Sequence, residues 1–338
     1  MGLGLSHAEV GLIRPAYPDF GQVFYLVDSD FRTAAQGWSQ ADRTGPLDLY
    51  EARKAGRGGT QYVYRDGDYT TTAVALQAAI DGMVDFRGDA LYFTPGAYTV
   101  ATARTIDVPD ARWLGPPVSH AANARATITA SVANALAVDA AADRMEIAYL
   151  QFVPLTAAAM WDVAAIKGLH AHHNYYNSDG IAASTATIFW TFATTAGDLV
   201  FENDYIVNDA AQGEWINCEG ITTQIRVKDF EIYLQAGTWA AAIDFAGVGV
   251  VNFAVGPGII TGTGAAALTS LITAADKTQG TTHGFTYGIR SSTSGPAATS
   301  LTVATGLAAE LDILDCHRAV ATDTANTATS YPWLPFTG

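Results

Sequence analysis

The chain has 338 residues, of which 49% are hydrophobic, and it carries 18 basic against 33 acidic side chains, for a net charge of −15. This length and hydrophobic content suffice for a large buried core, whereas the acidic balance argues against binding to nucleic acid or to an anionic membrane surface. No run of 18 or more uncharged apolar residues occurs and the N-terminus lacks the basic, apolar, small-residue order of a secretion signal, so we expect neither membrane insertion nor secretion by that route.

Residues 1–45 differ from the rest of the chain, because prolines and glycines interrupt short apolar pieces there. Within this segment, Gly21–Asp28 (GQVFYLVD) has the composition of a strand. We interpret residues 1–45 as an extended arm that attaches the chain to a particle or a partner protein. The side chains expected to make this attachment are Pro15, Tyr17, Pro18 and Phe20.

Residues 46–100 predict a capping region with helices and the first coils of a repeat. Helical stretches are predicted at Leu47–Gly56 and Thr72–Met83, and each precedes a similar segment, Val63–Thr70 (VYRDGDYT) or Tyr92–Thr99 (YFTPGAYT). Each of these segments predicts a strand, a tight turn on glycine and an aromatic residue that returns to the core. In the second helix one face is expected to be buried, and it consists of Leu76, Ala79, Ile80 and Met83, opposite Val74, Ala78 and Asp81.

The order ALQAAID, short loop, ALYFTPGAYTV resembles the N-terminal cap of pectate-lyase-like β-helices, including many tailspikes of tailed phages. The matching positions are Leu76 to Asp81, then Leu91, Phe93, Pro95, Gly96 and Tyr98. The resemblance implies a helix that plugs the open end of a right-handed parallel β-helix, and physics favours such a plug because an open end exposes apolar side chains and strand edges. The chain departs from the pattern at Arg87, Gly88 and Asp89, where the family usually has a glycine pair, and no catalytic residue of the family aligns.

A nine-residue pattern occurs five times between residues 145 and 259, with starts 24, 30, 26 and 26 residues apart. Two alternate places are apolar in every copy, which predicts a strand with one buried face. The copies begin at Met145, Leu169, Leu199, Ile225 and Val251. One such strand cannot bury its face alone, so this period predicts a solenoid whose coils stack into a continuous core.

A second apolar stripe in the gaps between copies has the same period. It consists of Val163, Ile188, Ile216, Ile243 and Ile272, spaced by 25, 28, 27 and 29 residues. These segments favour β-branched and aromatic residues rather than the leucines or helix formers of other repeats, and they lack the four strands per blade of a propeller. We therefore predict an all-β, right-handed parallel β-helix over residues 101–311, followed by an extended tail over 312–338.

The HAHH motif contains the candidate metal ligands. His170 and His172 are two apart on a predicted strand and so project from one face, with Glu202 as the candidate third ligand. Placing the coils in register, however, stacks Glu146 against His170, and His172 against Glu202 and then Lys228. These rungs of opposite charge or hydrogen-bonding partners are the favoured interpretation, and no cofactor is expected.

Outward acids are the candidate catalytic residues. Glycoside hydrolysis needs two carboxyl groups roughly 5 to 9.5 Å apart, and the pairs Glu202 with Asp204 and Asp204 with Asp229 are expected to meet that distance. Any acidic β-helix offers such pairs, so catalysis is not the favoured interpretation.

Tyr175 and Tyr205 share an outward place in the pattern and are predicted to stack, which suits binding of sugar rings or a subunit contact. Tyr176, one place later, falls in line with Phe152 and Ile206 and is predicted to be core.

Together with the resemblance, the sequence favours a structural protein of a tailed-phage virion, projecting as a spike, fibre or capsid-surface decoration. We expect a homotrimer that contacts other virion proteins through the arm and host glycans through its surface. We expect no binding to nucleic acid and no membrane insertion. The protein is expected to be assembled in the host cytoplasm and to be located in the virion. The alternatives are a polysaccharide depolymerase, lyase or hydrolase, and a non-catalytic carbohydrate-binding adhesin. Whether the chain is an enzyme is left open by the sequence, which favours a non-enzymatic role.

Overall fold

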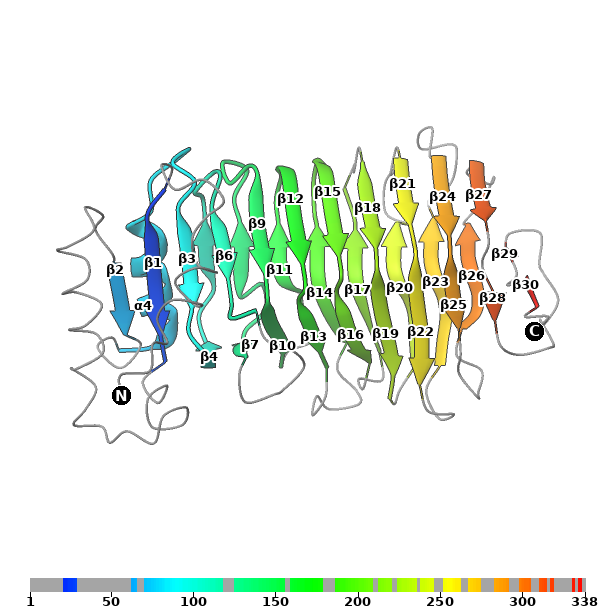
Figure 1. Cartoon of the computed structure of the whole chain (residues 1–338), viewed down its shortest axis with the longest axis horizontal. Coiled ribbons are helices and arrows are strands. Elements are labelled where there is room, and N and C mark those ends of the chain that lie inside the picture. The colour runs from blue at the N-terminus through cyan, green and yellow to red at the C-terminus, as the bar shows by residue number, and fades with distance from the viewer. Residues whose placement is uncertain are drawn as a thin grey trace, which may run out of the picture.

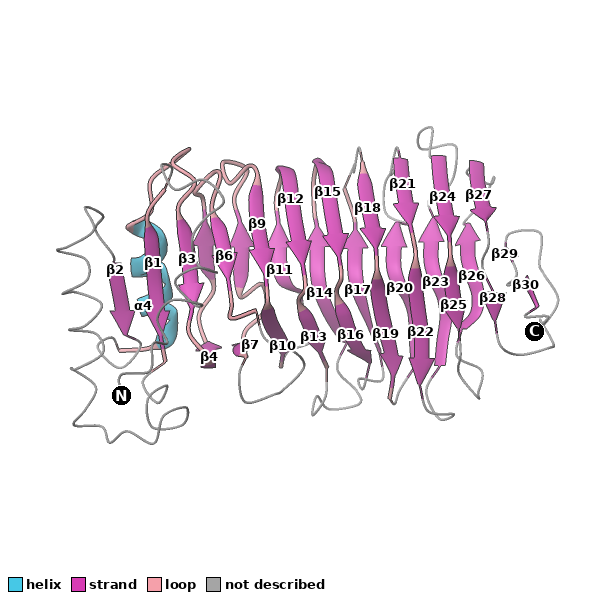
Figure 2. Cartoon of the chain, in the orientation of Figure 1, coloured by secondary structure: helices cyan, strands magenta, loops and turns pink. Residues whose placement is uncertain are grey.

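The computed structural model is an elongated β-solenoid in which the chain winds through three parallel sheets (Figure 1). It describes residues 21–28, 62–65, 70–117, 125–155, 159–178, 186–208, 212–220, 224–235, 238–245, 252–262, 267–274, 283–291, 298–304, 310–314, 317–318, 330–331 and 334–335. One helix, α4, lies at one end of the rod, and strands make up the rest of the regular structure in these ranges (Figure 2). The predicted all-β parallel β-helix with an N-terminal capping helix is confirmed.

Sheet A contains 11 strands among the described residues. In spatial order they are β2 (Tyr62–Arg65), β1 (Val23–Val27), β3 (Ala90–Phe93), β6 (Arg112–Leu114), β9 (Met145–Ala148), β12 (Ile166–His172), β15 (Ala196–Glu202), β18 (Ile225–Lys228), β21 (Asn252–Val255), β24 (His283–Tyr287) and β27 (Glu310–Leu314).

Sheets B and C follow in each coil, with 10 and 9 strands in the same ranges. Sheet B runs β4 (Gly96–Val100), β7 (Ala126–Ala130), β10 (Leu150–Pro154), β13 (Tyr175–Asn177), β16 (Tyr205–Asn208), β19 (Phe230–Leu234), β22 (Gly258–Gly262), β25 (Ile289–Ser291), β28 (His317–Arg318) and β30 (Leu334–Pro335). Sheet C runs β5 (Arg104–Ile106), β8 (Leu136–Val138), β11 (Ala159–Val163), β14 (Ala186–Phe192), β17 (Gln212–Cys218), β20 (Thr238–Phe245), β23 (Ala267–Ala274), β26 (Ala298–Ala304) and β29 (Ser330–Tyr331), and the β26–β29 pair is antiparallel.

The repeated nine-residue pattern is a strand, a corner and a second strand, rather than the single strand expected. In four of the five copies the corner falls on a non-glycine residue with φ between 54° and 61°, namely Tyr149, His173, Asn203 and Asp229. This left-handed conformation turns the chain from sheet A into sheet B, and asparagine and aspartate adopt it more readily than most residues.

Two registers differ from the sequence prediction. In the fifth copy Phe253, not Val251, pairs with Ile225, because alternate apolar residues leave a shift of two undetermined. In the second stripe Trp161 and Trp190 align with Ile216, whereas Val163 and Ile188 do not. In three strands of sheet C two consecutive residues are both fully buried, which interrupts the expected alternation. These pairs are Met160 with Trp161, Phe189 with Trp190, and Trp215 with Ile216.

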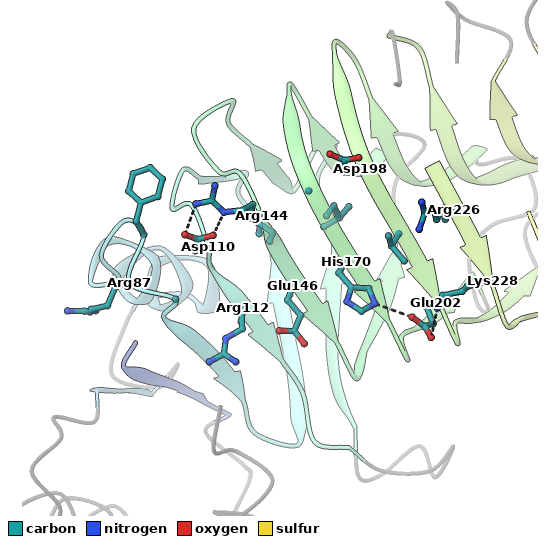
Figure 3. A pocket seen from close by; sticks show the side chains of 16 residues that line it. Arg87, Asp110, Arg112, Arg144, Glu146, His170, Asp198, Glu202, Arg226 and Lys228 are labelled. Atoms are coloured by element: carbon teal, nitrogen blue, oxygen red, sulfur yellow. Dashed lines mark hydrogen bonds and ion pairs between the residues drawn. The ribbon is translucent and has the colours of Figure 1, made fainter. Parts of the chain in front are cut away.

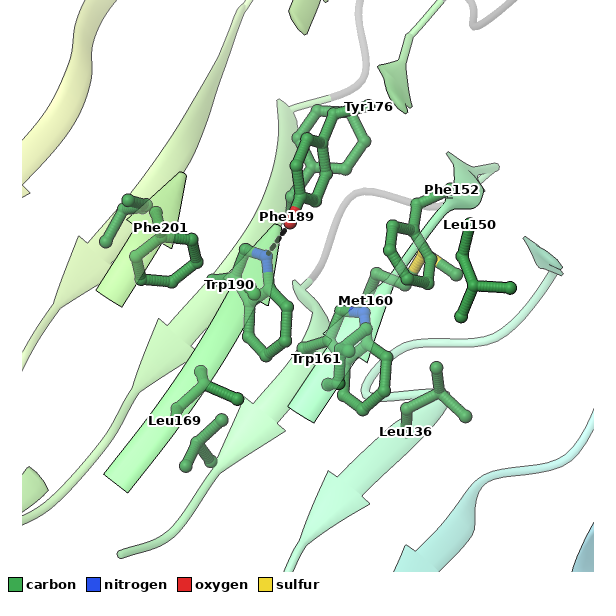
Figure 4. Packing of buried hydrophobic residues seen from close by; sticks show 14 of the residues in the cluster. Leu136, Leu150, Phe152, Met160, Trp161, Leu169, Tyr176, Phe189, Trp190 and Phe201 are labelled. Atoms are coloured by element: carbon green, nitrogen blue, oxygen red, sulfur yellow. Dashed lines mark hydrogen bonds between the residues drawn. The ribbon is translucent and has the colours of Figure 1, made fainter. Parts of the chain in front are cut away.

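Aromatic side chains stack along the middle of the core (Figure 4). Trp161 and Trp190 lie parallel with ring centroids 4.7 Å apart, and Trp161 also packs edge-on against Trp113 at 5.4 Å. Trp190 donates a hydrogen bond from Nε1 to the hydroxyl of Tyr176, at 3.1 Å. Tyr176 is fully buried in line with Phe152 and Ile206, so its predicted core position is confirmed.

The capping helix α4 spans Thr72–Asp81 and covers the N-terminal end of the core. Its Thr71 N-cap accepts a hydrogen bond from the amide of Val74, which satisfies one free helix-terminal donor. The buried face includes Leu76, Ala79 and Ile80, as the sequence predicted. The helix expected at 47–56 lies outside the described residues.

Strand β1, which the sequence placed in the arm, belongs to the solenoid. It pairs in parallel with β2 on one side and β3 on the other. The fully buried Asp89 holds it there, because this carboxylate accepts the amide of Gln22 at 2.7 Å and pairs with Arg87 at 2.6 Å. The arm of residues 1–45 therefore includes a core strand at 23–27, and its residues 1–20 and 29–45 lie outside the described ranges.

Candidate functional site

A groove of about 820 Å³ crosses the outward face of sheet A over strands β6 to β18 (Figure 3). Its floor is a grid, because side chains two apart on each strand point outward and neighbouring strands lie in register. The second row of this grid is Arg112, Glu146, His170, Val200 and Arg226. The third row in register is Leu114, Ala148, His172, Glu202 and Lys228, of which Glu202 and Lys228 line the groove.

The first row of the grid forms the rim, two residues before the second row. Several of these residues again have a left-handed backbone, with φ of 61° at Asp110, 59° at Arg144 and 53° at Asp198. Arg144 pairs with Asp110 through two bonds, one of them 2.7 Å between Nη2 and Oδ2. The rim therefore presents charged side chains held by a mutual ion pair.

The groove is nearly balanced in charge, although the chain as a whole carries almost two acids for each base. Its basic lining residues are Arg87, Arg112, Arg144, Arg226 and Lys228, and its acidic ones are Asp110, Glu146, Asp198 and Glu202. The groove thus offers hydrogen-bond donors and acceptors together on an otherwise acidic molecule.

Two carboxylates in the groove are joined to the histidines of the intervening strand. Glu146 Oε1 lies 3.0 Å from Nε2 of His172, and Glu202 Oε2 lies 3.3 Å from Nε2 of His170. Lys228 pairs with Glu202 at 2.9 Å. The hydrogen bond from His172 lowers the pKa of Glu146, and the one from Lys228 lowers the pKa of Glu202. Burial lowers the pKa of His170.

Phe86 stands at the end of the groove, with 69% of its surface exposed. Its φ is 59° and its amide donates to the carbonyl of Pro109 at 3.3 Å, so the backbone holds the ring outward. The guanidinium carbon of Arg144 lies 5.7 Å from the ring centroid. An exposed aromatic ring beside a cation provides an apolar surface for a ligand at the end of a polar groove.

The predicted register of the rungs is confirmed, and of the predicted partners Glu202 and Lys228 form an ion pair. Glu146 pairs in register with His170, and His172 pairs with Glu202, which pairs with Lys228. The hydrogen bonds, however, run diagonally, from His172 to Glu146 and from His170 to Glu202. Among the described residues no group of three or more His, Cys, Asp or Glu side chains is arranged to hold a metal ion.

Asp204 does not face outward as predicted, and it therefore forms no surface pair with Glu202 or Asp229. It follows the left-handed corner at Asn203, where the alternation of sheet A ends, and only 2% of it is exposed. Its Oδ1 accepts the amide of Asn174 at 2.8 Å, while burial raises its pKa well above the ordinary value. Asp229 is exposed on its own corner, outside the groove lining.

The tyrosine ladder is confirmed but lies on sheet B, away from the groove. Tyr175 and Tyr205 stack with centroids 5.2 Å apart and an interplanar angle of 10°, and the guanidinium carbon of Arg125 sits 4.0 Å from the Tyr175 centroid. The proposed attachment residues, Pro15, Tyr17, Pro18 and Phe20, lie outside the described residues.

Sequence reasoning missed Arg112, Arg144 and Phe86 as groove residues. The separation of Arg112 from its register partner Glu146 is 34 residues, longer than the spacing between the recognised copies, so the periodic pattern stopped short of this coil.

No protein-family model matches the chain, and no curated protein matches it. A solved structure, ORF18 of Geobacillus virus E2, is similar over 71% of this chain and 58% of that chain, with 12% identity and a TM-score of 0.30. At this TM-score the likeness supports no conclusion about fold or function. None of the helices in the described part of the chain has the length and apolarity needed to cross a bilayer.

Proposed function

We propose that the chain is a structural protein of a tailed-phage particle that projects as a spike, fibre or capsid-surface decoration and contacts host surface glycans through the sheet A groove. The observation that carries this proposal is a continuous solenoid core, closed at one end by α4, that displays a charge-balanced groove along its side. Stacked coils with a closed end form a durable rod, which suits a part that works outside a cell. The resemblance of Leu76–Asp81 and Leu91–Tyr98 to tailspike caps supports the phage setting.

Antibody labelling in the electron microscope tests the location of the protein. Particles and cleared lysate from the source of the chain are labelled in parallel. Label at fixed positions on particles is expected, on the head for a decoration and on the tail for a receptor-binding spike. Label confined to the soluble fraction of the lysate would overturn the structural role.

The groove suits a glycan because basic and acidic side chains line it in roughly equal number and an exposed aromatic ring lies beside them. Sugars present hydroxyl groups that both donate and accept, and apolar ring faces that pack on aromatic side chains. We therefore expect Phe86→Ala and Arg112→Gln to lose binding on an array of bacterial surface glycans. The matched control is Leu155→Ala, which truncates a side chain 48% exposed and outside the groove.

A polysaccharide depolymerase is the second candidate, favoured by the two groove carboxylates Glu146 and Glu202 that flank the histidines of β12. A hydrolase needs one carboxyl group protonated as the acid and one ionised as the base or nucleophile, whereas the lowered pKa of both Glu146 and Glu202 favours the ionised form of each. Release of new reducing ends from a bound polysaccharide, abolished by Glu202→Gln, would establish this activity. Binding without release would establish the adhesin instead.

The oligomeric state and the attachment to the particle are further parts of the proposed virion role. We propose a homotrimer joined to other virion proteins through residues 1–45, with Pro15, Tyr17, Pro18 and Phe20 in the contact. Light scattering of the purified chain tests the trimer by mass. Deletion of residues 1–20, which leaves β1 in place, is expected to abolish incorporation into particles without changing the circular dichroism of the solenoid.

A further inference from the structure

The side chains of His172 and His173 converge, although consecutive residues on a strand normally point to opposite faces. His172 ends β12, and His173 occupies the left-handed corner with φ of 56°. This conformation turns the second imidazole toward the first, so that the two Nδ1 atoms lie 2.9 Å apart with the ring planes at 82°. Two ring nitrogens at this distance can share one proton or one metal ion.

Both rings are held in place by neighbours other than each other. Nε2 of His172 lies 3.0 Å from Glu146 Oε1, and the ring of His173 stacks on Tyr149 with centroids 5.0 Å apart. The amide of His173 donates to the carbonyl of Glu202 at 2.9 Å, which fixes the corner. A carboxylate on the far nitrogen of an imidazole is the usual outer partner of a metal-ligating histidine, because it fixes the tautomer that leaves the near nitrogen free to bind.

The distance between the nitrogens favours one class of metal. With metal–nitrogen bonds of about 2.05 Å, a nitrogen separation of 2.9 Å corresponds to an angle of about 90° at the metal, whereas a tetrahedral ion needs about 3.3 Å. A right angle is the geometry of tetragonal Cu²⁺ and Ni²⁺. We propose that His172 and His173 form a bidentate site for Cu²⁺ or Ni²⁺, with water in the remaining coordination positions.

The absence of a third protein ligand among the described residues is consistent with water completing the site. Binding requires both Nδ1 atoms to be unprotonated, so His173 must carry its proton on Nε2. The other titratable groups around the pair are His170, Glu146, Glu202 and Tyr149, and the two carboxylates attract a metal ion.

Calorimetric titration of the full chain with CuCl₂ and NiCl₂, with electron paramagnetic resonance of the copper form, tests the site. The variants are His172→Gln and His173→Asn, the latter because asparagine keeps the left-handed corner. Each variant is expected to lose one metal-binding site per chain, together with the nitrogen hyperfine splitting in the spectrum of the copper form. Glu146→Gln is expected to weaken binding about 10-fold, as loss of an outer partner does. Lys167→Gln is the matched control, since it changes an exposed side chain near the start of the same strand.

Unchanged affinity and stoichiometry in both His172→Gln and His173→Asn, with the melting temperature preserved, would overturn the proposal. So would tighter binding of Zn²⁺ than of Ni²⁺ by the parent chain, because it contradicts the right-angle geometry. The site does not depend on the proposed virion role, and metal titration leaves that role untouched.

Discussion

At the scale of single residues, the structure buries several carboxyl groups beside the core, and Glu214 is the one with a defined consequence for pH. It lies on β17, and its Oε2 has no hydrogen-bond partner. Burial first, and repulsion from Asp244 and Glu219 second, raise its pKa from 4.5 to about 7. Between these two values the folded chain holds a proton that the unfolded chain has lost, so its contribution to stability declines as pH rises through this window.

We therefore predict that Glu214→Gln raises the melting temperature relative to the parent chain at pH 8 and leaves it nearly unchanged at pH 5. The amide lacks the charge whose burial is unfavourable at high pH. Scanning calorimetry at the two pH values measures the difference. Asp85→Asn, at an exposed position, is the control and is expected to change neither value. An equal shift at both pH values would show that Glu214 is not the group responsible.

The side of the sheet that a side chain faces could be predicted from the sequence within a strand, but not at the corners between strands. The rungs of Glu146 with His170 and of Glu202 with Lys228 follow from alternation along strands in register. Asp204 was assigned to the wrong side because the left-handed residue before it interrupts the alternation, and no apolar pattern marks that break. The groove also includes the coil of β6, whose longer spacing falls outside the repeated pattern. For this reason the sequence indicated only the part of the groove from Glu146 to Lys228.

At the scale of elements, the left-handed corners determine how β9, β12, β15 and β18 of sheet A pass into sheet B. Their backbone hydrogen bonds continue from coil to coil, as from His173 to Glu202 and from Asn203 to Lys228. A non-glycine residue in this conformation costs roughly 1–2 kcal/mol. The corners therefore tolerate asparagine and aspartate better than β-branched residues.

Asp229→Val is predicted to destabilise the fold by about 1–2 kcal/mol, because valine disfavours the φ of 54° at this exposed corner. The midpoint of urea unfolding measures the loss. Glu231→Val, on β19 two residues later, makes a comparable side-chain change outside the corner and is expected to have little effect. Equal destabilisation by both variants would point to loss of charge rather than to the backbone.

The tryptophan stack is the second feature at this scale. Trp161→Ala is predicted to cost about 3–5 kcal/mol, because it removes contacts with Trp113, Phe152 and Trp190 and leaves a cavity. Urea unfolding and near-ultraviolet circular dichroism measure the loss of stability and of the stacked indole signal. Leu155→Ala, at a side chain 48% exposed, is expected to change neither. A cost below about 1 kcal/mol would contradict the buried stack.

At the scale of the whole molecule, the coils of the solenoid repeat along its length, and the apolar core must be covered at the end of the rod. Each coil buries its apolar face only against its neighbours, so the first coil depends on α4. Leu76 and Ile80 are at most 1% exposed in that contact. The sequence predicted this helix and its buried face correctly because amphipathic spacing is a local signal. It did not predict the partners of β1, because a strand pattern does not specify which strand lies beside it.

Leu76→Asp is predicted to open this end of the rod and to cause association of chains, because it places a charge against the core and exposes strand edges. Size-exclusion chromatography with light scattering measures the mass. Val74→Asp introduces the same carboxylate on the outer face of the first helical turn, where a negative charge is favourable, and is expected to leave the mass unchanged. An unchanged mass for Leu76→Asp would show that α4 is not required as a plug.

The placement of β1 between β2 and β3 has a consequence for the order of assembly. Neighbouring coils in the middle of the rod join strands about 24–30 residues apart and can add one after another from any starting point. By contrast, Val23 pairs with Ala90, 67 positions later in the sequence, and among the described strands β2 pairs with β1 alone. Closing a loop of this length costs more conformational entropy than joining neighbouring coils. We therefore expect this end of the rod to form later than the middle and to exchange its amide protons first.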